Sequence, residues 1–274
     1  MAPVSTVAEV FDAIQGAKGG ASAFCTNFFP AQGKLQAWID HGELLGERRH
    51  QATFFLRQDR DFWHLYFCAS SVAVLRQEIT ALAAVKTERV AVDLVGTEAG
   101  LGELLAVLEA AGFRRYARLV RLARPGQGFP PQASVDGAEV YCADESDGQA
   151  ILNLLEASFD RYADQLPTLY EIEAAIAARQ VLTVKSEGTL AALLFFETQG
   201  LTSTVRYWVV DPRFRSHRFG SAVMRHYLVT QNAVRRFILW VMADNENAVL
   251  KYRHYGYVPD GLTDWVIANK MTRV

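Results

Sequence analysis

The stretch VDPRFRSHRFGSAVM, residues 210–224, decides the interpretation of the second half of the chain. An apolar run reaches Val210 and stops at Asp211-Pro212, a polar loop follows, and Gly220 opens a segment with helical spacing. The first turn of a helix has backbone N–H groups without intrahelical partners, and a small residue there lets an anion approach them. The loop also supplies three basic side chains: Arg213, Arg215 and Arg218. The stretch predicts an anion site, although a solvated arginine loop with a packing glycine fits its spacing equally well.

The sequence on both sides of this stretch alternates between strand-like and helix-like patterns. Strands are expected at 138–143, 181–185, 189–198, 201–210 and 237–243, with a closing strand pair over 257–268. Helices are expected at 147–179, with a break at Pro167, and at 216–232 and 246–255. This order predicts an α/β protein with a mixed sheet flanked by helices.

The first half shows a fainter version of the same order. Strands are expected at 54–57, 62–70, 90–95 and 114–122, and helices at 72–84 and 101–111. Pro, Gly and small polar residues crowd together between the halves, and a chain of 274 residues is long enough for two domains. We therefore expect a first domain at 1–124, a linker at 125–137 and a second domain at 138–274, related by duplication of one fold.

Composition and charge exclude several classes of partner. The chain has 28 basic and 30 acidic residues and a formal net charge of -2, without a basic run, so we expect no nucleic-acid partner. Its apolar stretches are too short to span a bilayer, and no secretory signal is evident at the amino terminus. Three scattered cysteines indicate neither a disulfide framework nor a metal site. We expect a cytoplasmic protein without a metal or a membrane partner, either a monomer or a homodimer.

A second stretch, DNENAVLKYRHYGY at residues 244–257, strengthens the interpretation. Together the two stretches resemble the motifs of the GNAT family of acyl-coenzyme A dependent N-acyltransferases. The phosphate-loop motif V-x-P-x-x-[RQ]-G-x-G-x-G/A is matched by Val210, Pro212, Arg215 and Gly220, whereas Ser216 and Arg218 stand where the family often has glycine. The motif N-x-x-A-x-x-x-Y-x-x-x-G-[FY] is matched at every fixed position, by Asn245, Ala248, Tyr252, Gly256 and Tyr257. The resemblance covers residues 138–274 and implies a GNAT-like fold there.

The resemblance also implies a cofactor and the residues that bind it. Coenzyme A, with acetyl-CoA as the acyl donor, is expected between the strand that ends at Val210 and the strand that begins near Phe237. The residues implied in cofactor binding are Trp208, Val209, Val210, Arg215, Ser216, His217, Arg218, Phe219, Gly220, Ser221, Ala222, Asn245, Ala248 and Tyr252. Two hypotheses follow from Ser216 and Arg218: an arginine that holds a coenzyme phosphate, or a loop too crowded for the cofactor. We favour binding, because the backbone N–H groups of residues 219–221 can still meet an anion.

Acyl transfer to an amine needs a polarised thioester carbonyl, a base and an acid. By family resemblance, a backbone N–H within 206–210 holds the carbonyl and Tyr252 is the acid. A turn at Gln199-Gly200 would place Glu197 opposite Thr202, on the face of the sheet where a base is needed, so Glu197 is the candidate base; a solvated hairpin glutamate is equally compatible. The candidate substrate-binding residues are Arg206, Tyr162 and Asp160. Arg206 could instead pair with Glu197 and weaken it as a base.

The leading hypothesis is an N-acetyltransferase that moves the acetyl group of acetyl-CoA to a primary amine of a small molecule. The alternatives are transfer of a longer or carrier-bound acyl group, or a non-catalytic coenzyme A binding module. The first half has no glycine-rich loop after residues 69–71 and lacks the Asn and Tyr of the later motif. We therefore expect a degenerate GNAT-like domain that has lost coenzyme binding, in tandem with the active one.

Overall fold

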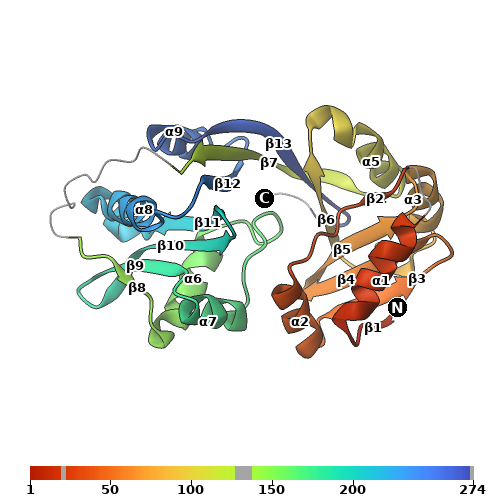
Figure 1. Ribbon diagram of the computed structural model, residues 1–274, viewed down its shortest axis with the longest axis horizontal. Helices are drawn as coiled ribbons and strands as arrows, with labels where there is room; N and C mark the ends of the chain where they lie inside the picture. Colours follow the sequence, from red (N-terminus) through yellow and green to blue (C-terminus); the bar gives the residue numbers. More distant parts are fainter. Residues whose placement is uncertain (20–22, 127–137, 272–274) are drawn as a thin grey trace. The chain divides into compact units, whose positions relative to one another are not determined.

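The structure is a computed structural model that describes residues 1–19, 23–126 and 138–271 (Figure 1). The chain forms two compact units: unit 1 comprises Met1–Leu119 and Gly261–Val274, and unit 2 comprises Val120–Asp260. The chain therefore passes from unit 1 to unit 2 within one strand, β7 (Arg114–Pro125), and returns within another, β13 (Val258–Ala268). The expected linker lies elsewhere, at 125–137, and its residues 127–137 are outside the described part of the chain.

Unit 1 has a mixed sheet. Its strands are β1 (Ala2–Pro3), β2 (Cys25–Thr26), β3 (Leu44–Arg48), β4 (Ala52–Asp59), β5 (Phe62–Ala69) and β6 (Val90–Gly96), and they are joined by parts of β7 and β13. Its helices are α1 (Val7–Lys18), α2 (Gln32–Asp40), α3 (Val72–Ile79), α4 (Ala83–Thr87) and α5 (Glu98–Ala110). Neighbouring strands follow the order β1-β3-β4-β5-β6-β13, and β2 pairs with β5. The β5–β6 pair is parallel, as the expected strand–helix–strand order requires.

Helices cover both faces of the sheet in unit 1. Alternate residues of β4 and β5 point to opposite faces. Phe54 and Phe67 belong to the core under α3 and α5. Phe55 and Cys68 belong to the core under α1 and α2. Helices α1 and α2 were absent from the expected elements.

Unit 2 repeats this plan. Its strands are β8 (Tyr141–Cys142), β9 (Val181–Ser186), β10 (Thr189–Gln199), β11 (Thr202–Val210) and β12 (Arg236–Met242), and part of β7 lies beside β12. Its helices are α6 (Gly148–Ser158), α7 (Leu169–Ala177), α8 (Phe219–Thr230) and α9 (Glu246–His254), with the 3-10 turns η1 (Glu145–Asp147) and η2 (Pro212–His217). Strands follow the order β7-β12-β11-β10-β9-β8, and β11–β12 is the parallel pair. The α/β class with a mixed sheet is confirmed.

The core of unit 2 also has two layers. Residues such as Leu194 and Val223 pack between the sheet and helices α8 and α9. Leu193 and Ile172 pack between the opposite face and helices α6 and α7. Strand β10 therefore buries both of its faces, which explains the nearly continuous apolar run at 190–196.

Three expected boundaries were wrong. The expected strand pair over 257–268 is instead one long strand, β13, at Val258–Ala268, and Gly261, with φ of 89°, lies within it. Helix α8 begins at Phe219 instead of residue 216, because the preceding residues form the turn η2. Residues 125 and 126 are not linker: Pro125 ends β7, and the Gly126 N–H donates to the carbonyl oxygen of Arg235 at 2.8 Å.

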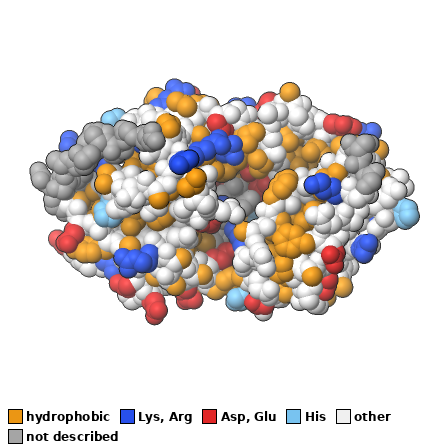
Figure 2. All heavy atoms as spheres, viewed as in Figure 1, with side chains coloured by type: hydrophobic (Ala, Val, Ile, Leu, Met, Phe, Trp, Pro, Cys, Tyr) orange, Lys and Arg blue, Asp and Glu red, His pale blue; other side chains and the backbone are white. Residues whose placement is uncertain are grey.

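The face drawn in Figure 2 carries basic and acidic side chains interspersed among apolar ones. Within the described part of the chain, no helix combines the length and the apolar character that crossing a membrane requires.

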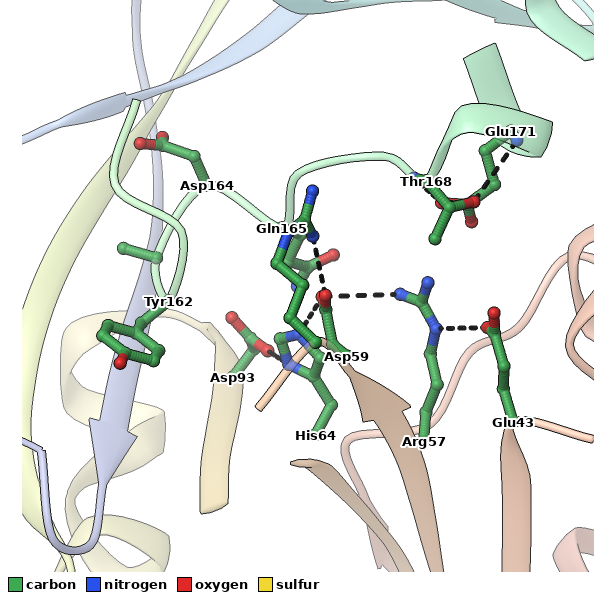
Figure 3. Close-up of polar contacts among 12 residues, drawn as sticks. Glu43, Arg57, Asp59, His64, Asp93, Tyr162, Asp164, Gln165, Thr168 and Glu171 are labelled. Atoms are coloured by element: carbon green, nitrogen blue, oxygen red, sulfur yellow. Dashed lines mark hydrogen bonds and ion pairs between the residues drawn. The ribbon is translucent and has the colours of Figure 1, made fainter. Parts of the chain in front are cut away.

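A buried polar network crosses the sheet of unit 1 (Figure 3). His64 Nε2 lies 3.2 Å from Asp59 Oδ2, and His64 Nδ1 lies 3.5 Å from Asp93 Oδ2. Asp59 is also 2.7 Å from the Arg60 guanidinium and 4.0 Å from that of Arg57. Buried charges are tolerated only when they are paired, so this row of opposite charges fixes how β4, β5 and β6 lie next to one another.

The network shifts the pKa of its central histidine. Burial alone would lower the pKa of His64, but the hydrogen bond to Asp59 and the negative charges of Asp93 and Asp59 outweigh burial and raise it. The pKa of Asp59 is lowered: burial would raise it, and the hydrogen bond to His64 and the charges of His64 and Arg57 act more strongly. Folding therefore stabilises the protonated form of His64 relative to its neutral form.

We expect the His64→Leu variant to lower the free energy of unfolding of unit 1 by about 3–5 kcal/mol, because two buried carboxylates lose their shared cation. Denaturant unfolding, followed in parallel by hydrogen exchange of β5, measures this loss. The matched control is Arg89→Gln, which removes an exposed ion pair of 2.7 Å with Asp61 in the same unit and should cost less than about 1 kcal/mol. Equal effects of the two variants would contradict the stabilising role of the network.

The contribution of His64 should also depend on pH. Because the folded pKa lies above the unfolded value of about 6.5, the stabilisation is fully present below pH 6.5. It is lost as the pH rises through the folded pKa. Wild-type unit 1 should become less stable along this rise, and the His64→Leu variant should lack that part of the pH dependence.

Candidate functional site

The site of unit 2 begins where two parallel strands stop pairing. Strands β11 and β12 pair from Thr202 with Arg236 to Val205 with Leu239, and no pairing is recorded between their described residues beyond that point. Parallel strands that separate leave backbone N–H and C=O groups on their inner edges without a ladder partner. Residues 206–210 of β11 therefore offer the free strand edge that the sequence predicted for cofactor binding.

A β-bulge lies at the point of separation. On its other edge β11 pairs with β10, and the register shifts there: Phe195 opposes Tyr207, whereas Phe196 opposes Val205. Arg206 is the extra residue, and such a bulge bends the strand and redirects the side chains that follow it. Strict alternation along 202–208, on which the predicted face of the strand depended, is therefore broken at Arg206.

The expected register of the β10–β11 hairpin was wrong by two residues. Gln199 pairs with Thr202, and Glu197 opposes Thr204 rather than Thr202, because the turn is formed around Gly200, with φ of 57°, and residue 201. A shift of two residues keeps Glu197 on the expected face. Its Oε1 lies 3.8 Å from Arg206 Nε, and its side chain is 49% exposed. Glu197 and Arg206 therefore form the ion pair that the sequence left open as an alternative to their roles as base and substrate-binding residue.

The loop after β11 ends in an uncapped helix. Asp211 accepts a hydrogen bond from the Arg213 N–H at 2.9 Å and opens the turn η2. Arg218 then adopts a left-handed conformation, with φ of 59° and ψ of 15°, and directly precedes α8. No side chain caps α8, and no acidic residue lies in its first turn. The N–H groups of its first turn, at residues 219–221, therefore remain available to an anion.

The three loop arginines are not equivalent. The Arg213 guanidinium is held by Asp211 through contacts of 3.0 Å and 2.7 Å, so it is engaged within the loop. Arg215 and Arg218 are exposed, as are Ser216 and His217 between them. Ser216 Oγ lies 3.3 Å from His217 Nδ1, and the His217 ring stacks on Phe219. Two arginines thus border the first turn of α8 and can reach an anion there.

Gly220 holds helix α8 against strand β11. A Cβ atom at this position would lie 2.8 Å from Val210 Cγ2 and 3.4 Å from Trp208 Nε1. The Trp208 indole N–H donates to the carbonyl oxygen of Gly220 at 3.0 Å. Ser221 and Ala222 continue the helix, and Ala222 is buried. The glycine of the motif is therefore required first for close packing of helix and strand.

Helix α9 brings the motif tyrosine to the same strand. Asn245 begins this helix, because its side-chain oxygen accepts a hydrogen bond from the Ala248 N–H at 3.1 Å. Tyr252 follows two turns later, is 9% exposed, and packs its ring 5.4 Å from that of Trp208. Burial, followed by the charge of Asp164, raises the pKa of Tyr252, which stays protonated at neutral pH. Asn245 and Ala248 thus act here in starting the helix that positions Tyr252.

The segment between α6 and α7 is attached to the bulged strand. The Tyr207 hydroxyl donates to the carbonyl oxygens of Gln165, at 2.6 Å, and Asp164, at 3.1 Å. Asp160 accepts hydrogen bonds from the N–H groups of Tyr162, at 2.9 Å, and Ala163, at 3.1 Å, so its carboxylate shapes the turn. Of the predicted substrate-binding residues, Asp160 has this local role, and Tyr162 lies on the turn that it forms. Thr168 and Glu171 then cap α7 (Figure 3).

Sequence reasoning missed two members of this site. Tyr207 was passed over because strict alternation assigned it to the far face of the strand, and only the bulge at Arg206 changes that. Glu171 was interpreted as part of a helix, whereas its charge acts on Arg206 and Tyr207. Burial raises the pKa of Tyr207 to about 12, so its hydroxyl remains a donor to the turn. A T-x-x-E capping box at 168–171 was the only available signal for Glu171.

The order of elements in unit 2, with a parallel strand pair that separates before an uncapped helix, defines an acyltransferase-type α/β domain of the GNAT fold. Residues 148–257 match the family model described as Acetyltransferase (GNAT) family, so the second half of the chain contains a GNAT domain. The resemblance stated from the two sequence motifs is confirmed. The match supports acyl transfer as the class of reaction and acetyl-CoA as the cofactor that the family generally uses.

Solved structures extend the similarity of fold over both units. A tandem GNAT protein from the clavulanic acid biosynthesis pathway is 13% identical, with a TM-score of 0.63, and the match covers 97% of this chain and 96% of that one. A GCN5-related N-acetyltransferase from Sphaerobacter thermophilus is 15% identical, with a TM-score of 0.58 and coverage of 98% and 94%. One from Kribbella flavida is 16% identical, with a TM-score of 0.58 and coverage of 86% and 93%. No curated protein matches the chain.

We expect Gly220→Ala to weaken coenzyme A binding by about tenfold or more and to destabilise unit 2 by about 1–3 kcal/mol, because the added Cβ forces α8 away from Val210. Isothermal titration with coenzyme A and thermal unfolding measure the two effects. Gly102→Ala in α5 is the control, since nothing lies within 4 Å of its added Cβ; it should leave binding unchanged and stabilise the protein by up to about 1 kcal/mol. Unchanged binding in the Gly220→Ala variant would exclude this strand–helix junction as the cofactor site.

Proposed function

We propose that this protein is an N-acetyltransferase that transfers the acetyl group of acetyl-CoA to a primary amine of a small molecule. The observation that carries the proposal is the position of Tyr252: a buried, protonated phenol packs against Trp208, on the strand edge that β12 leaves free. A donor at this edge can protonate a leaving thiolate, and an uncapped helix lies at the end of the same strand. The donor set fits coenzyme A, whose phosphates need N–H groups and cations and whose pantetheine amides need a free strand edge.

Each step of acyl transfer has a candidate residue in unit 2. The thioester carbonyl is polarised by a backbone N–H of β11 within 206–210, a group fixed in place before the reaction. The amine attacks that carbonyl carbon, and the C–S bond breaks as the electron pair moves to sulfur. The Tyr252 hydroxyl gives its proton to the sulfur. The first turn of α8, with Arg215 and Arg218, holds the phosphates and fixes the donor.

The base must take a proton from the acceptor's ammonium group, because only the neutral amine has a lone pair with which to attack the carbonyl carbon. Glu197 is the candidate on the predicted face, acting through a water molecule, and its ion pair of 3.8 Å with Arg206 competes with this role. Asp164 is a second candidate, because its charge reaches Tyr252. Its Oδ2 accepts a hydrogen bond from the Asp160 N–H at 2.8 Å and holds the turn. An acidic rim of this kind would also attract a cationic acceptor.

Two other functions use the same fold. Transfer of a longer or carrier-bound acyl group would need the same Tyr252 and the same strand edge. A non-catalytic coenzyme A binding module is favoured by one observation, that the Glu197 carboxylate is engaged by Arg206. A thiol-release assay with acetyl-CoA and longer acyl-CoA donors over a panel of small amines separates these functions. Cofactor binding without turnover of any donor–amine pair would favour the binding module.

We expect Tyr252→Phe to lower kcat by about 10²–10⁴-fold with little change in the Kd for coenzyme A, because only the transferable proton is removed. The matched control is Tyr257→Phe: its hydroxyl is buried in the same cluster and has no hydrogen-bond partner among the described residues. That variant should keep kcat within about threefold of the wild type. Equal losses in both variants would indicate a packing effect and remove Tyr252 as the acid.

Replacing each candidate base by its isosteric amide distinguishes Glu197 from Asp164. Glu197→Gln should lower kcat/KM by about 10²-fold or more if Glu197 is the base. Asp164→Asn, which keeps an oxygen acceptor for the Asp160 N–H, should then leave kcat/KM within about threefold of the wild type. The reverse pattern would assign the base to Asp164 and leave Glu197 as the ion-pair partner of Arg206.

A further inference from the structure

Unit 1 contains a strand separation like the one that forms the site of unit 2. Strands β5 and β6 are parallel and pair only from Trp63 with Val90 to His64 with Ala91. Each unit therefore places a helix after the first strand of a parallel pair and ends the pairing early: at His64 in β5 and at Val205 in β11. The residues that follow in β5 have inner-edge N–H and C=O groups that need partners.

Residues 25–28 of the chain itself occupy that separation. Strand β2 pairs antiparallel with β5, with Cys25 opposite Ala69 and Thr26 opposite Cys68. The Thr26 hydroxyl donates to the carbonyl oxygen of Phe67 at 2.7 Å. The next residue, Asn27, inserts its side chain between the two parallel strands.

Asn27 bridges the strands through its carboxamide. Its Nδ2 donates to the carbonyl oxygen of Leu65 in β5 at 3.0 Å and to that of Asp93 in β6 at 3.2 Å. Its Oδ1 accepts a hydrogen bond from the Phe67 N–H at 2.8 Å. The bridge thus satisfies an N–H and two carbonyl groups that the missing ladder leaves open.

The bonds made by Asn27 are of the type that a pantetheine amide would make. A carboxamide supplies one planar C=O acceptor and N–H donors, which are the groups an acyl-coenzyme A presents to a strand edge. In β5 the N–H that donates to the Asn27 carboxamide is that of Phe67, three residues beyond the last residue that pairs with β6. In β11 the N–H at the same distance from the last pair belongs to Trp208, within the segment proposed to polarise the thioester.

The helix that follows β5 is also closed to an anion. Only Ser70 and Ser71 lie between β5 and α3, in place of the eight-residue basic loop of unit 2. The Ser71 hydroxyl caps α3 by accepting a hydrogen bond from the Val74 N–H at 3.2 Å. The corresponding helix of unit 2, α8, has no side-chain cap. Both parts of a coenzyme site, the strand edge and the helix start, are thus satisfied in unit 1 by the chain.

We propose that residues 25–28 are a built-in substitute for the coenzyme in unit 1, with Asn27 in the place of a pantetheine amide. Unit 1 takes no acyl-coenzyme A, and each chain binds one coenzyme A, in unit 2. The expected stoichiometry of one coenzyme A per chain rests on the proposed function of unit 2. The occupation of the strand separation of unit 1 by residues 25–28 is independent of that function. The first half therefore keeps the separated parallel strands of the fold, and residues of the same chain occupy the space between them.

Native mass spectrometry with coenzyme A counts the sites on the full chain. We expect one coenzyme A per wild-type chain, and Gly220→Ala should bind it about tenfold or more weakly. A second coenzyme A on the wild type, or one retained in full by Gly220→Ala, would place it in unit 1 and overturn the inference. Absence of binding by the wild type would defeat the proposed function and still agree with a closed unit 1.

Hydrogen exchange tests the occupant independently of cofactor binding. Residues 62–69 should exchange slowly in the wild type, and coenzyme A should not change exchange over 25–28 or 62–69. Asn27→Asp places carboxylate oxygens against two carbonyl oxygens and should speed exchange over 62–69 by about tenfold or more. The control is Asn153→Asp at an exposed position of α6; it keeps its acceptor for Gln149 Nε2 and should have no effect there. Exchange over 62–69 that is already fast in the wild type, or that coenzyme A alters, would overturn the proposal.

Discussion

The proposed function of this protein depends on a parallel strand pair that stops early. In unit 2, β11 and β12 share a ladder over only four residues before they separate, and a bulge at Arg206 coincides with the separation. Backbone groups released from a sheet ladder must find other partners or remain exposed, because leaving them buried and unpaired costs free energy. A ligand with amide groups can supply those partners, so in the proposed function the unfinished ladder is the basis of coenzyme binding.

The other features of unit 2 keep this edge open and provide it with chemistry. Gly220 lets α8 approach β11 closely enough for the Trp208 indole to reach its carbonyl oxygen. The left-handed Arg218 turns the chain into α8 without a side-chain cap, at a cost of about 1–2 kcal/mol that glycine would avoid. Strain kept beside an anion site agrees with a role for the Arg218 guanidinium there. Asn245 starts α9 so that Tyr252 lies against Trp208.

The two units show two ways of satisfying one geometry. Unit 2 leaves the strand edge and the helix start free, whereas unit 1 fills the first with Asn27 and the second with Ser71. The buried charges of His64, Asp59 and Asp93 add to the stability of the sheet of unit 1. A duplicated fold can in this way keep its topology after losing its ligand, since the backbone requires partners of a given geometry rather than a particular molecule.

The sequence by itself determined the class of fold, the order of most elements and the GNAT motifs. These are local properties: apolar periodicity, a glycine beside a strand end, and an Asn followed seven residues later by Tyr. Only the tertiary structure decided the register of the β10–β11 hairpin, the bulge at Arg206, the engagement of Arg213 by Asp211 and the insertion of Asn27 between β5 and β6. Each of these depends on which strands lie side by side and on which backbone groups remain unpaired, and spacing along the chain does not specify either.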